Sequence, residues 1–495
     1  MNIIRDTYFF DSSKALEVAM QKNSLMPLSN MYCSYKLFDY SAQDEYVQFD
    51  YKDMQICYYG GELLDNCPEN LVHLPLESFY EFCLNTRYRL PQIVDFEGLD
   101  ASELVKVEIY GLLKVLIEKV FADRKILTGR FIDSISTSRL DFNEPLRVFL
   151  VASRHTRVMQ YCSRDIADAF MEIGFDVKFE IESNSMEVIE NYHWLKSLSE
   201  YNPHVTININ HMNNEFLNDA IFNIVWFQDP MSRLLDGEPV WLRSKDFIFS
   251  LTPAIDSLLV NKKIPFERQS FCTNNRMSQM IQTIKRENKI VFIGSSYYQT
   301  ISHSYEALKS IDYLTNIFLD GENFGNDLVE DVCYRFGLDS AFVETRLLPY
   351  IVRDIGLLNF VRRYKEYDIE LYGWGWDVYD ELQPYYKGVL KHGEEIEKVY
   401  CSARFAFAPH QNYTLQQRVF EAASCGAIPI VYDCLSLSKE ARYQDLIYFK
   451  RIDDLSGLFD IEAKDADFSN FLNVHNYKSF ARKIIKLIGS YNEIN

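Results

Sequence analysis

The feature that most constrains the fold is an alternation of short apolar runs with helical segments. The run "LRVFLVAS" from Leu146 is rich in large and β-branched apolar residues, and the helical stretch "YCSRDIADAFMEIG" follows it after a polar turn. Gly174 ends that stretch before the next apolar run, "FDVKFEI". Neighbouring parallel strands need crossover connections, which are usually helices, so this pattern predicts a parallel sheet.

The alternation occurs in two series. The first continues through "PHVTININ", "NIVWFQD" and "DFIFSLT", and the second runs from "KIVFIGSS" through "DIELYGWGW" and "ARFAFAPH" to "AIPIVYD". Residues 323–363 interrupt the second series and have a helical pattern. We therefore predict an α/β chain with two Rossmann-like doubly wound domains, residues 141–275 and 276–495.

The first 140 residues have a different pattern. They contain aromatic strand-like runs such as "EYVQFDYKDMQICYY" and one long helical stretch that begins at Ala101. We predict an additional N-terminal α+β domain over residues 1–140. A chain of 495 residues is too long for one compact core, which fits this division into three.

Charge and cysteine usage narrow the class of protein. The net charge of −20 argues against nucleic-acid binding, which needs many Lys and Arg side chains on phosphates. A small phosphorylated ligand needs only a local cationic site. The 10 cysteines show no metal-ligand spacing, and neither a leader nor an integral membrane segment is evident. We expect a cytoplasmic protein, and homo-oligomerisation stays open.

The loops after the strands of the second series are candidates for a ligand site, because ligands of open α/β sheets bind outside the carboxyl ends of the strands. These loops are "GSSYY" after Ile293, "GWGWD" after Tyr372, "KGVLKHGEE" around Gly388, and "HQNYTLQQR" after Pro409. The last of them leads directly into a helix.

That helix carries a pattern suited to a nucleoside diphosphate. Thr414 and Gln417 fit a capping box, which predicts a helix from about Thr414 to Gly426. Its N-terminal N–H groups could seat a diphosphate. Arg418 could add a bidentate cation, and Glu421 could accept two ribose hydroxyls. The alternative is a surface ion pair between Arg418 and Glu421, which are three residues apart.

The segment "GVLKHGEEIEKVYCSARFAFAPHQNYTLQQRVFEAASCGAIPIVYD" resembles the nucleotide-sugar half of GT-B fold glycosyltransferases. It is most similar to the CgeB-like branch, which is named after a spore-maturation protein. Looser similarity in "FIGSSYY", "YGWGWD" and "VWFQDP" extends the resemblance to roughly residues 146–440. The resemblance implies transfer of a sugar from a nucleotide-diphosphate sugar to a hydroxyl of a glycan or protein acceptor, with neither metal nor other cofactor.

The resemblance also implies roles for particular residues. Glu421 would bind the donor ribose, Arg418 with Gly294 and Ser295 would face the diphosphate, and Lys387–Val389 would lie along the base. The predicted donor site, with further residues from the same loops, comprises Gly294, Ser295, Gly373, Trp374, Lys387, Gly388, Val389, His410, Gln417, Arg418 and Glu421.

Three features of this site leave alternatives. The segment around Gly373 and Trp374 could instead be a structural turn with packed indoles, and His410 is given no proton-transfer role. Many retaining GT-B enzymes have a second glutamate about two turns before the ribose-binding one, and here Tyr413 takes that place. The stereochemistry of transfer is therefore open.

Two residues of the first series are candidates for the catalytic base. His155 lies in "SRHTRVMQ" after the first strand, and Asp229 lies in "WFQDP" after an apolar strand. Either side-chain type can take the proton of an acceptor hydroxyl, and Pro230 behind Asp229 favours that residue. Helix capping and turn formation are ordinary alternatives for both. For the whole chain, a sugar-nucleotide epimerase and a non-catalytic nucleotide-binding scaffold remain alternative functions.

Overall fold

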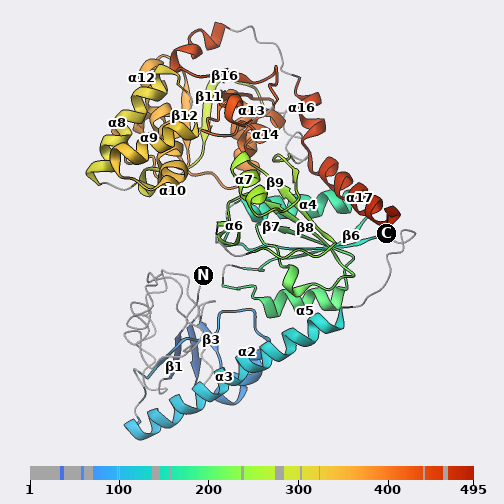
Figure 1. Cartoon of the computed structure of the whole chain (residues 1–495). Helices are drawn as coiled ribbons and strands as arrows, with labels where there is room; N and C mark the ends of the chain where they lie inside the picture. Colours follow the sequence, from blue (N-terminus) through green and yellow to red (C-terminus); the bar gives the residue numbers. More distant parts are fainter. Residues whose placement is uncertain are drawn as a thin grey trace. The chain divides into compact units, whose positions relative to one another are not determined.

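The computed structural model describes residues 34–37, 57–60, 71–96, 99, 101–135, 145–156, 158–184, 186–235, 239–273, 284–301, 304–322, 324–438, 441–460 and 467–494 (Figure 1). By its internal contacts the chain divides into two units, Met1–Asn223 with Arg243–Asp246, and Ile224–Leu242 with Phe247–Asn495. Within the described ranges, no helix is long and apolar enough to cross a membrane.

The described strands form three sheets, with the orders β3-β2-β1-β4, β10-β9-β8-β7-β5-β6 and β13-β12-β11-β14-β15-β16. The strands of the first sheet are β1 (Ser34–Leu37), β2 (Cys57–Gly60), β3 (Leu71–His73) and β4 (Ile93–Asp95). Those of the second are β5 (Arg147–Val151), β6 (Asp176–Glu180), β7 (Val205–Ile209), β8 (Phe222–Phe227), β9 (Asp246–Ser250) and β10 (Glu267–Arg268). Those of the third are β11 (Glu287–Ile293), β12 (Ile369–Tyr372), β13 (Tyr386–Gly388), β14 (Ala403–Phe407), β15 (Ile428–Tyr432) and β16 (Ile447–Phe449).

Helices connect these strands, as the alternation predicts. The first unit contains α2 (Phe79–Asn85), α3 (Glu103–Ser134), α4 (Met159–Glu172) and α5 (Asn191–Tyr201). The second contains α6 (Ser232–Leu235), α7 (Pro253–Asn261), α8 (Tyr305–Asp320), α9 (Asn326–Phe336), α10 (Ser340–Phe342), α11 (Leu348–Tyr350), α12 (Gly356–Arg363), α13 (Glu394–Ser402), α14 (Gln417–Ser424), α15 (Leu435–Ser438), α16 (Ser469–Val474) and α17 (Tyr477–Ile494). Two π-helical segments, η7 (Val343–Leu347) and η8 (Ile351–Ile355), flank α11.

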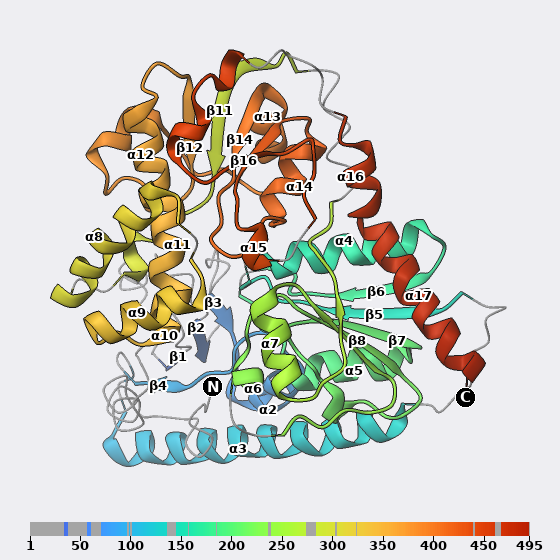
Figure 2. The same cartoon turned by 45° about the horizontal axis from the view of Figure 1, so that its top comes forward.

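The third sheet is covered by helices on both faces. Successive side chains of β11 point to opposite faces of the sheet and show this double burial. Ile290 and Phe292 belong to a buried apolar cluster that includes residues of α8, α9 and α12. Val291 and Ile293 pack on the other side with residues of α13 and α14. Figure 2 shows these two groups of helices beside opposite faces of the sheet. The continuous apolar runs of the second series are explained by this double burial.

The last helix, α17, packs against strands β8 to β10, although it lies far from these strands in the sequence. The Phe480 ring lies 5.3 Å from the Trp226 ring and 5.1 Å from the Phe249 ring, measured between centroids. Lys483 Nζ lies 3.0 Å from Glu267 Oε2. These three partners of α17 belong to the same unit as the helix.

The N-terminal module, defined here as the described residues before 136, contains a sheet of four strands whose three pairings are parallel. The helix expected from Ala101 is confirmed as α3. Most of the run "EYVQFDYKDMQICYY" lies outside the described residues. The predicted α/β class with Rossmann-like parallel sheets is confirmed, whereas the boundaries of the three domains stay a prediction.

Candidate functional site

Glycines mark the carboxyl ends of three neighbouring strands in the third sheet. The Gly294 N–H donates to the Tyr372 carbonyl at 2.8 Å, and the Gly373 N–H donates to the Gly388 carbonyl at 2.9 Å. Gly373 has a φ of 130° and Gly388 a φ of 100°, a region that favours glycine. The structure therefore brings together three loops that the sequence separates.

Gly294 lies directly under the guanidinium of Arg418. A Cβ atom on Gly294 would lie 2.6 Å from Arg418 Cζ. Arg418 Cζ also lies 5.8 Å from the centre of the Phe292 ring. Glycine is needed at this position because the guanidinium occupies the space of a side chain.

We expect Gly294→Ala to displace Arg418 without unfolding the protein, because the clashing atoms are the end of a flexible side chain. If the displaced guanidinium serves a bound anion, the affinity for nucleoside diphosphate should fall about 10-fold, the loss of one weakened charge-assisted contact. Isothermal titration calorimetry with UDP and GDP measures this change. Unchanged affinity for every diphosphate bound by the wild type would contradict a role for Arg418 at this position.

Helix α14 begins later than the sequence pattern predicts. It covers Gln417–Ser424, with Gln416 at the N-cap and no side-chain cap. The capping box at Thr414 is wrong, because the Thr414 side chain is buried and its Oγ1 lies 3.6 Å from Cys434 Sγ. The Gln416 side chain instead donates to the Ala408 carbonyl at 2.6 Å. The first N–H groups of α14 are therefore not capped by a side chain.

Glu421 is a buried carboxyl one turn into this helix. It is 8% exposed, and its Oε1 accepts a hydrogen bond of 2.8 Å from Gln417 Nε2. Burial raises the pKa of Glu421, and the Arg418 charge opposes this rise. Glu421 and Arg418 form no ion pair with each other in the described structure. The alternative of a surface ion pair between them is therefore wrong.

Arg353 in η8 is a second cation at this edge of the sheet. It is 7% exposed, its Nη1 donates to the Ser295 carbonyl at 3.2 Å, and its Nε has no hydrogen-bond partner. Its Cζ lies 4.2 Å from the centre of the Tyr297 ring. Burial lowers the pKa of Arg353, and the nearby positive charge of Arg418 lowers it further. Neither guanidinium forms an ion pair with a carboxylate in the described part of the chain.

His410 and Tyr413 lie beside the two arginines. Their rings are 4.0 Å apart, and His410 Nδ1 is a buried atom without a hydrogen-bond partner among the described residues. Burial lowers the pKa of His410 well below its ordinary value, and the charges of Arg353 and Arg418 add to this effect. His410 is therefore neutral near pH 7, and its lack of a proton-transfer role stays a prediction.

Asp354, the neighbour of Arg353, holds the loop after β11. Its Oδ2 accepts hydrogen bonds from Ser296 Oγ at 2.5 Å, from the Tyr297 N–H at 3.0 Å, and from Tyr379 Oη at 3.1 Å. Arg353 holds the same loop at the Ser295 carbonyl. The two consecutive residues of η8 thus fix the loop that follows Gly294.

The Asp354 carboxyl predicts a pH dependence of stability. Burial raises its pKa from 3.8 to about 6, against the hydrogen bonds of Ser296 and Tyr297. Its protonation therefore stabilises the fold fully below about pH 4, and this contribution is lost as the pH rises through about 6. We expect Asp354→Asn, which keeps an oxygen acceptor, to exceed wild-type stability by up to about 3 kcal/mol above pH 7 and to match it near pH 4. Urea unfolding at pH 4, 5.5 and 7.5 tests this, and a difference independent of pH would contradict it.

Three further residues of the predicted donor site, Trp374, Lys387 and Val389, are exposed. Trp374 is 62% exposed, and its carbonyl accepts from the Ser296 N–H at 2.8 Å. Trp376 is fully buried and donates from Nε1 to the Gly294 carbonyl at 2.6 Å. The interpretation of two packed indoles is therefore wrong for Trp374. Lys387 and Val389, on either side of Gly388, are exposed at the end of β13.

Residues 353–465 match the protein family model described as "Glycosyl transferase-like". This segment is glycosyltransferase-like. It begins at Arg353 and contains His410, Arg418 and Glu421. Among curated proteins, none matches the chain in sequence.

Solved structures of glycosyltransferases are similar to a larger part of the chain. AviGT4, a glycosyltransferase involved in avilamycin A biosynthesis, is 11% identical, with a TM-score of 0.43 over 69% of this chain and 96% of that one. Sucrose-phosphate synthase from Thermosynechococcus elongatus is 9% identical, with a TM-score of 0.42 over 71% of this chain and 100% of that one. An alpha-glucosyltransferase in complex with UDP and DNA is 12% identical, with a TM-score of 0.37 over 70% and 99% of the two chains.

Arg353 and Asp354 of the glycosyltransferase-like segment are residues that sequence reasoning missed. They lie in the helical insertion before β12, where a charged pair has no periodicity that distinguishes it from a solvated helix face. The consecutive pair "RD" within the apolar string "YIVRDIGLL" is the signal that could have found them, because charges within such a string are rarely buried without a partner.

The two candidates for the catalytic base lie in different units. Asp229 follows β8 and is exposed, and it belongs to the same unit as the glycosyltransferase-like segment. Burial raises the pKa of Tyr413, and Tyr297 and Asp229 add to the rise. His155 follows β5, is exposed, and has Nε2 at 3.3 Å from the Glu187 carbonyl oxygen. Neither side chain is assigned a role by this geometry.

No group of three or more His, Cys, Asp and Glu side chains that could hold a metal is present in the described part of the chain. The charged groups near Gly294 are instead the two guanidiniums and the buried carboxyls of Glu421 and Asp354. An anionic ligand suits such a site, because unpaired guanidiniums attract a counter-charge.

Proposed function

We propose that the chain is a glycosyltransferase of the CgeB-like branch that moves a sugar from a nucleotide-diphosphate sugar to a hydroxyl of a glycan or protein acceptor. The proposal is carried by the guanidiniums of Arg353 and Arg418, which lie at the glycine-lined end of the third sheet. Within the described residues, neither of them forms an ion pair with a carboxylate. The glycosyltransferase-like segment supports the type of reaction.

The electrostatics favour a diphosphate over a neutral ligand. Burying a cation costs several kcal/mol unless an anion or hydrogen bonds compensate. Arg353 is buried with an unpartnered Nε, and the positive charge of Arg418 lowers its pKa further. A diphosphate would neutralise both guanidiniums and would accept from the uncapped N–H groups of α14.

In this proposal the leaving diphosphate is stabilised by protein groups. Arg418 and Arg353 face the two phosphates, and the N-terminus of α14 adds partial positive charge as negative charge develops on the leaving group. These groups make a bound metal unnecessary, so transfer is expected to persist in excess chelator. Glu421 accepts the ribose hydroxyls, with Gln417 orienting its carboxyl.

The acceptor side of the proposal rests on the first series of strands. Asp229 would take the proton of the acceptor hydroxyl as that oxygen attacks the anomeric carbon, with His155 as the alternative base. The nucleotide diphosphate leaves from the opposite side of the anomeric carbon if transfer inverts configuration. Pro230, which follows Asp229 and restricts the backbone at the strand end, favours Asp229 over His155.

Calorimetric titration with UDP, GDP, ADP and TDP tests the donor site. We expect Arg418→Ala and Glu421→Ala each to lower the affinity for the diphosphate that binds wild type by about 10- to 100-fold, the loss of one charged or bidentate contact. Arg363→Ala is the matched control, because Arg363 is an exposed arginine of α12 with a surface partner, Asp453, at 3.1 Å. Affinities of the two site variants equal to that of the control would remove the proposed site.

Product analysis separates glycosyl transfer from the alternatives. Mass spectrometry of products from a panel of sugar nucleotides should show free nucleotide diphosphate and a glycosylated acceptor. An epimerase would return a sugar nucleotide of unchanged mass, and a scaffold would bind the diphosphate without turnover. Either result would overturn the proposed reaction while leaving the binding site in place.

A further inference from the structure

The 180–190 segment begins at the last residue of β6, and the structure describes its residues 180–184 and 186–190. It contacts both the N-terminal module and the loop after β5 within the first unit. It leaves the carboxyl end of the sheet at Glu180, whose carbonyl accepts from the Ala152 N–H at 3.0 Å. The carboxyl ends of β5 and β6 are where ligands of such sheets bind. Contacts that hold this segment therefore influence the conformation of the loops at the carboxyl ends of β5 and β6.

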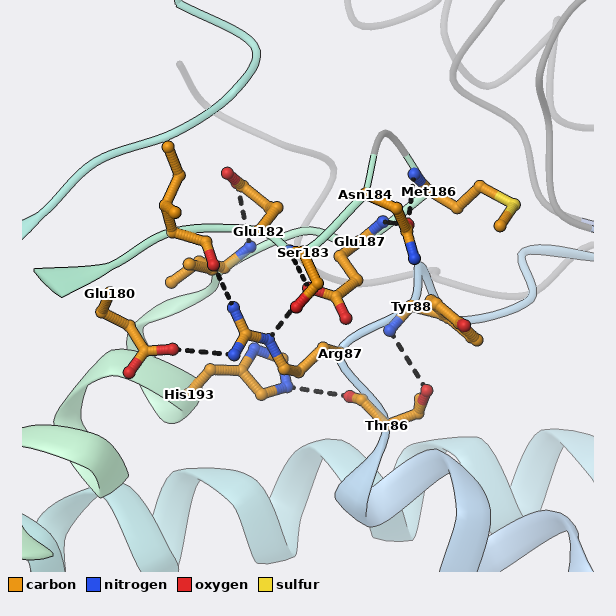
Figure 3. Close-up of polar contacts among 12 residues, drawn as sticks. Thr86, Arg87, Tyr88, Glu180, Glu182, Ser183, Asn184, Met186, Glu187 and His193 are labelled. Carbon is orange, nitrogen blue, oxygen red and sulfur yellow. Dashed lines mark hydrogen bonds and ion pairs between the residues drawn. The ribbon is translucent and has the colours of Figure 1, made fainter. Parts of the chain in front are cut away.

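On one side, Arg87 of the N-terminal module holds the 180–190 segment at three points. Its Nη1 donates to Glu180 Oε1 at 2.7 Å, and its Nη2 donates to the Ile181 carbonyl at 2.8 Å. Its Nε lies 3.3 Å from Glu187 Oε2, an ion pair in which Nε forms no hydrogen bond. Figure 3 shows the guanidinium between the carboxylates of Glu180 and Glu187. The Arg87 carbonyl also accepts from the Val188 N–H at 2.8 Å.

Apolar and backbone contacts extend the same attachment. Met186 packs against the core of the N-terminal module, which includes Phe79 and Leu113. Tyr88 and Glu187 form an antiparallel bridge. The conformation of residues 186–188 therefore depends on the N-terminal module.

On the other side, the 180–190 segment holds the loop after β5. Glu182 is 1% exposed, and its carboxylate accepts from Ser153 Oγ at 2.9 Å and from the Arg154 N–H at 2.7 Å. The Glu187 carbonyl lies 3.3 Å from His155 Nε2. Glu187 thus contacts Arg87 with its side chain and His155 with its backbone.

We infer that the N-terminal module is an acceptor-positioning element and that Arg87 is its positioning residue, acting on residues 152–156 through the 180–190 segment. This inference rests on the proposed function, in which the first series of strands faces the acceptor. A planar guanidinium with two carboxylates and a carbonyl fixes both ends of the segment at once, which an ammonium cannot do. Loops held in this way keep reacting groups in the geometry that transfer requires.

The experiment compares Arg87→Met, Arg87→Lys and the control Arg130→Met, an exposed arginine of α3. A panel of p-nitrophenyl glycosides and Ser/Thr peptides is first screened with the wild-type protein. The compound that most increases the release of nucleotide diphosphate is used as the acceptor. We expect Arg87→Met to raise the KM for that acceptor about 10-fold, with donor KM and donor hydrolysis within about twofold of wild type, and Arg87→Lys to recover part of the loss. Hydrogen exchange of residues 153–156 and 182–188 should rise in Arg87→Met and not in Arg130→Met.

The outcomes separate this inference from the proposed function. Unchanged exchange of residues 153–156 in Arg87→Met would show that Arg87 does not order the loop. Increased hydrogen exchange of residues 153–156 with an unchanged acceptor KM would show that Arg87 orders the loop but does not position the acceptor. A wild-type protein that transfers no sugar from any donor would overturn the proposed function and the acceptor role with it, while the exchange result still decides whether Arg87 orders the loop.

Discussion

Replacing Arg353 with methionine is expected to weaken nucleoside diphosphate binding about 100-fold and to make the ligand-free protein more stable by about 1–2 kcal/mol. The two effects have opposite signs because the buried Arg353 charge, beside that of Arg418, lacks a carboxylate ion pair in the described structure. Methionine retains much of the side-chain volume and removes the charge, and it loses the hydrogen bond to the Ser295 carbonyl and the contact of the guanidinium with the Tyr297 ring. Calorimetric titration and thermal unfolding without ligand measure the two effects.

Arg363→Met is the control for this prediction, because Arg363 is an exposed arginine of α12, and its surface ion pair is worth less than about 1 kcal/mol. That variant should bind the diphosphate as wild type does. Weaker binding of Arg353→Met together with lower ligand-free stability would mean that Arg353 serves chiefly as a structural residue at Ser295. Retained binding would exclude Arg353 from the anion site.

Replacing Gly373 with alanine should destabilise the protein by about 4 kcal/mol or more, the range of severe backbone and packing disruption. A Cβ atom there would lie 2.2 Å from the Gly294 carbonyl oxygen, and the φ of 130° is strained for any residue with a side chain. The backbone atoms of Gly294 cannot move aside as a flexible side chain can. Urea unfolding measures the loss, and a midpoint within error of wild type would contradict the close approach of these two loops.

Gly388→Ala is the matched control for Gly373→Ala. Gly388 lies at the neighbouring strand end with a φ of 100°, but a Cβ atom added there would meet no described atom within 4 Å. Only conformational strain of about 1–2 kcal/mol is expected there. A larger loss at Gly388 than at Gly373 would show that backbone strain outweighs steric overlap at this edge.

The central strands of the two series, such as β8 and β11, could be predicted because each contains a continuous apolar run that is buried on both faces. The runs around Val291 and Ile430 carry this signal. Strands β10, β13 and β16 have two or three residues and lie at or near sheet edges, so they carry no such run. The return of α17 to the sheet of β8 also has no local signal, because Phe480 could pack equally well on any apolar face.

The candidate site could be predicted only in part. Arg418 and Glu421 could be named as candidates because they follow a strand, a polar loop and a helix start in order, and their roles stay a prediction. The prediction of a capping box at Thr414 was wrong because sequence spacing does not show whether the threonine hydroxyl faces the helix or the core. Arg353 was missed because only the fold places η8 beside the loop of Ser295.

Helix α17 has a practical consequence for dividing the molecule. A fragment that ended before Tyr477 would lack the ring that covers Trp226 and Phe249, and one that held only the second sheet would expose the same two aromatic side chains to water. The β8 to β10 region must therefore be produced together with α17, which lies more than 200 residues further along the sequence.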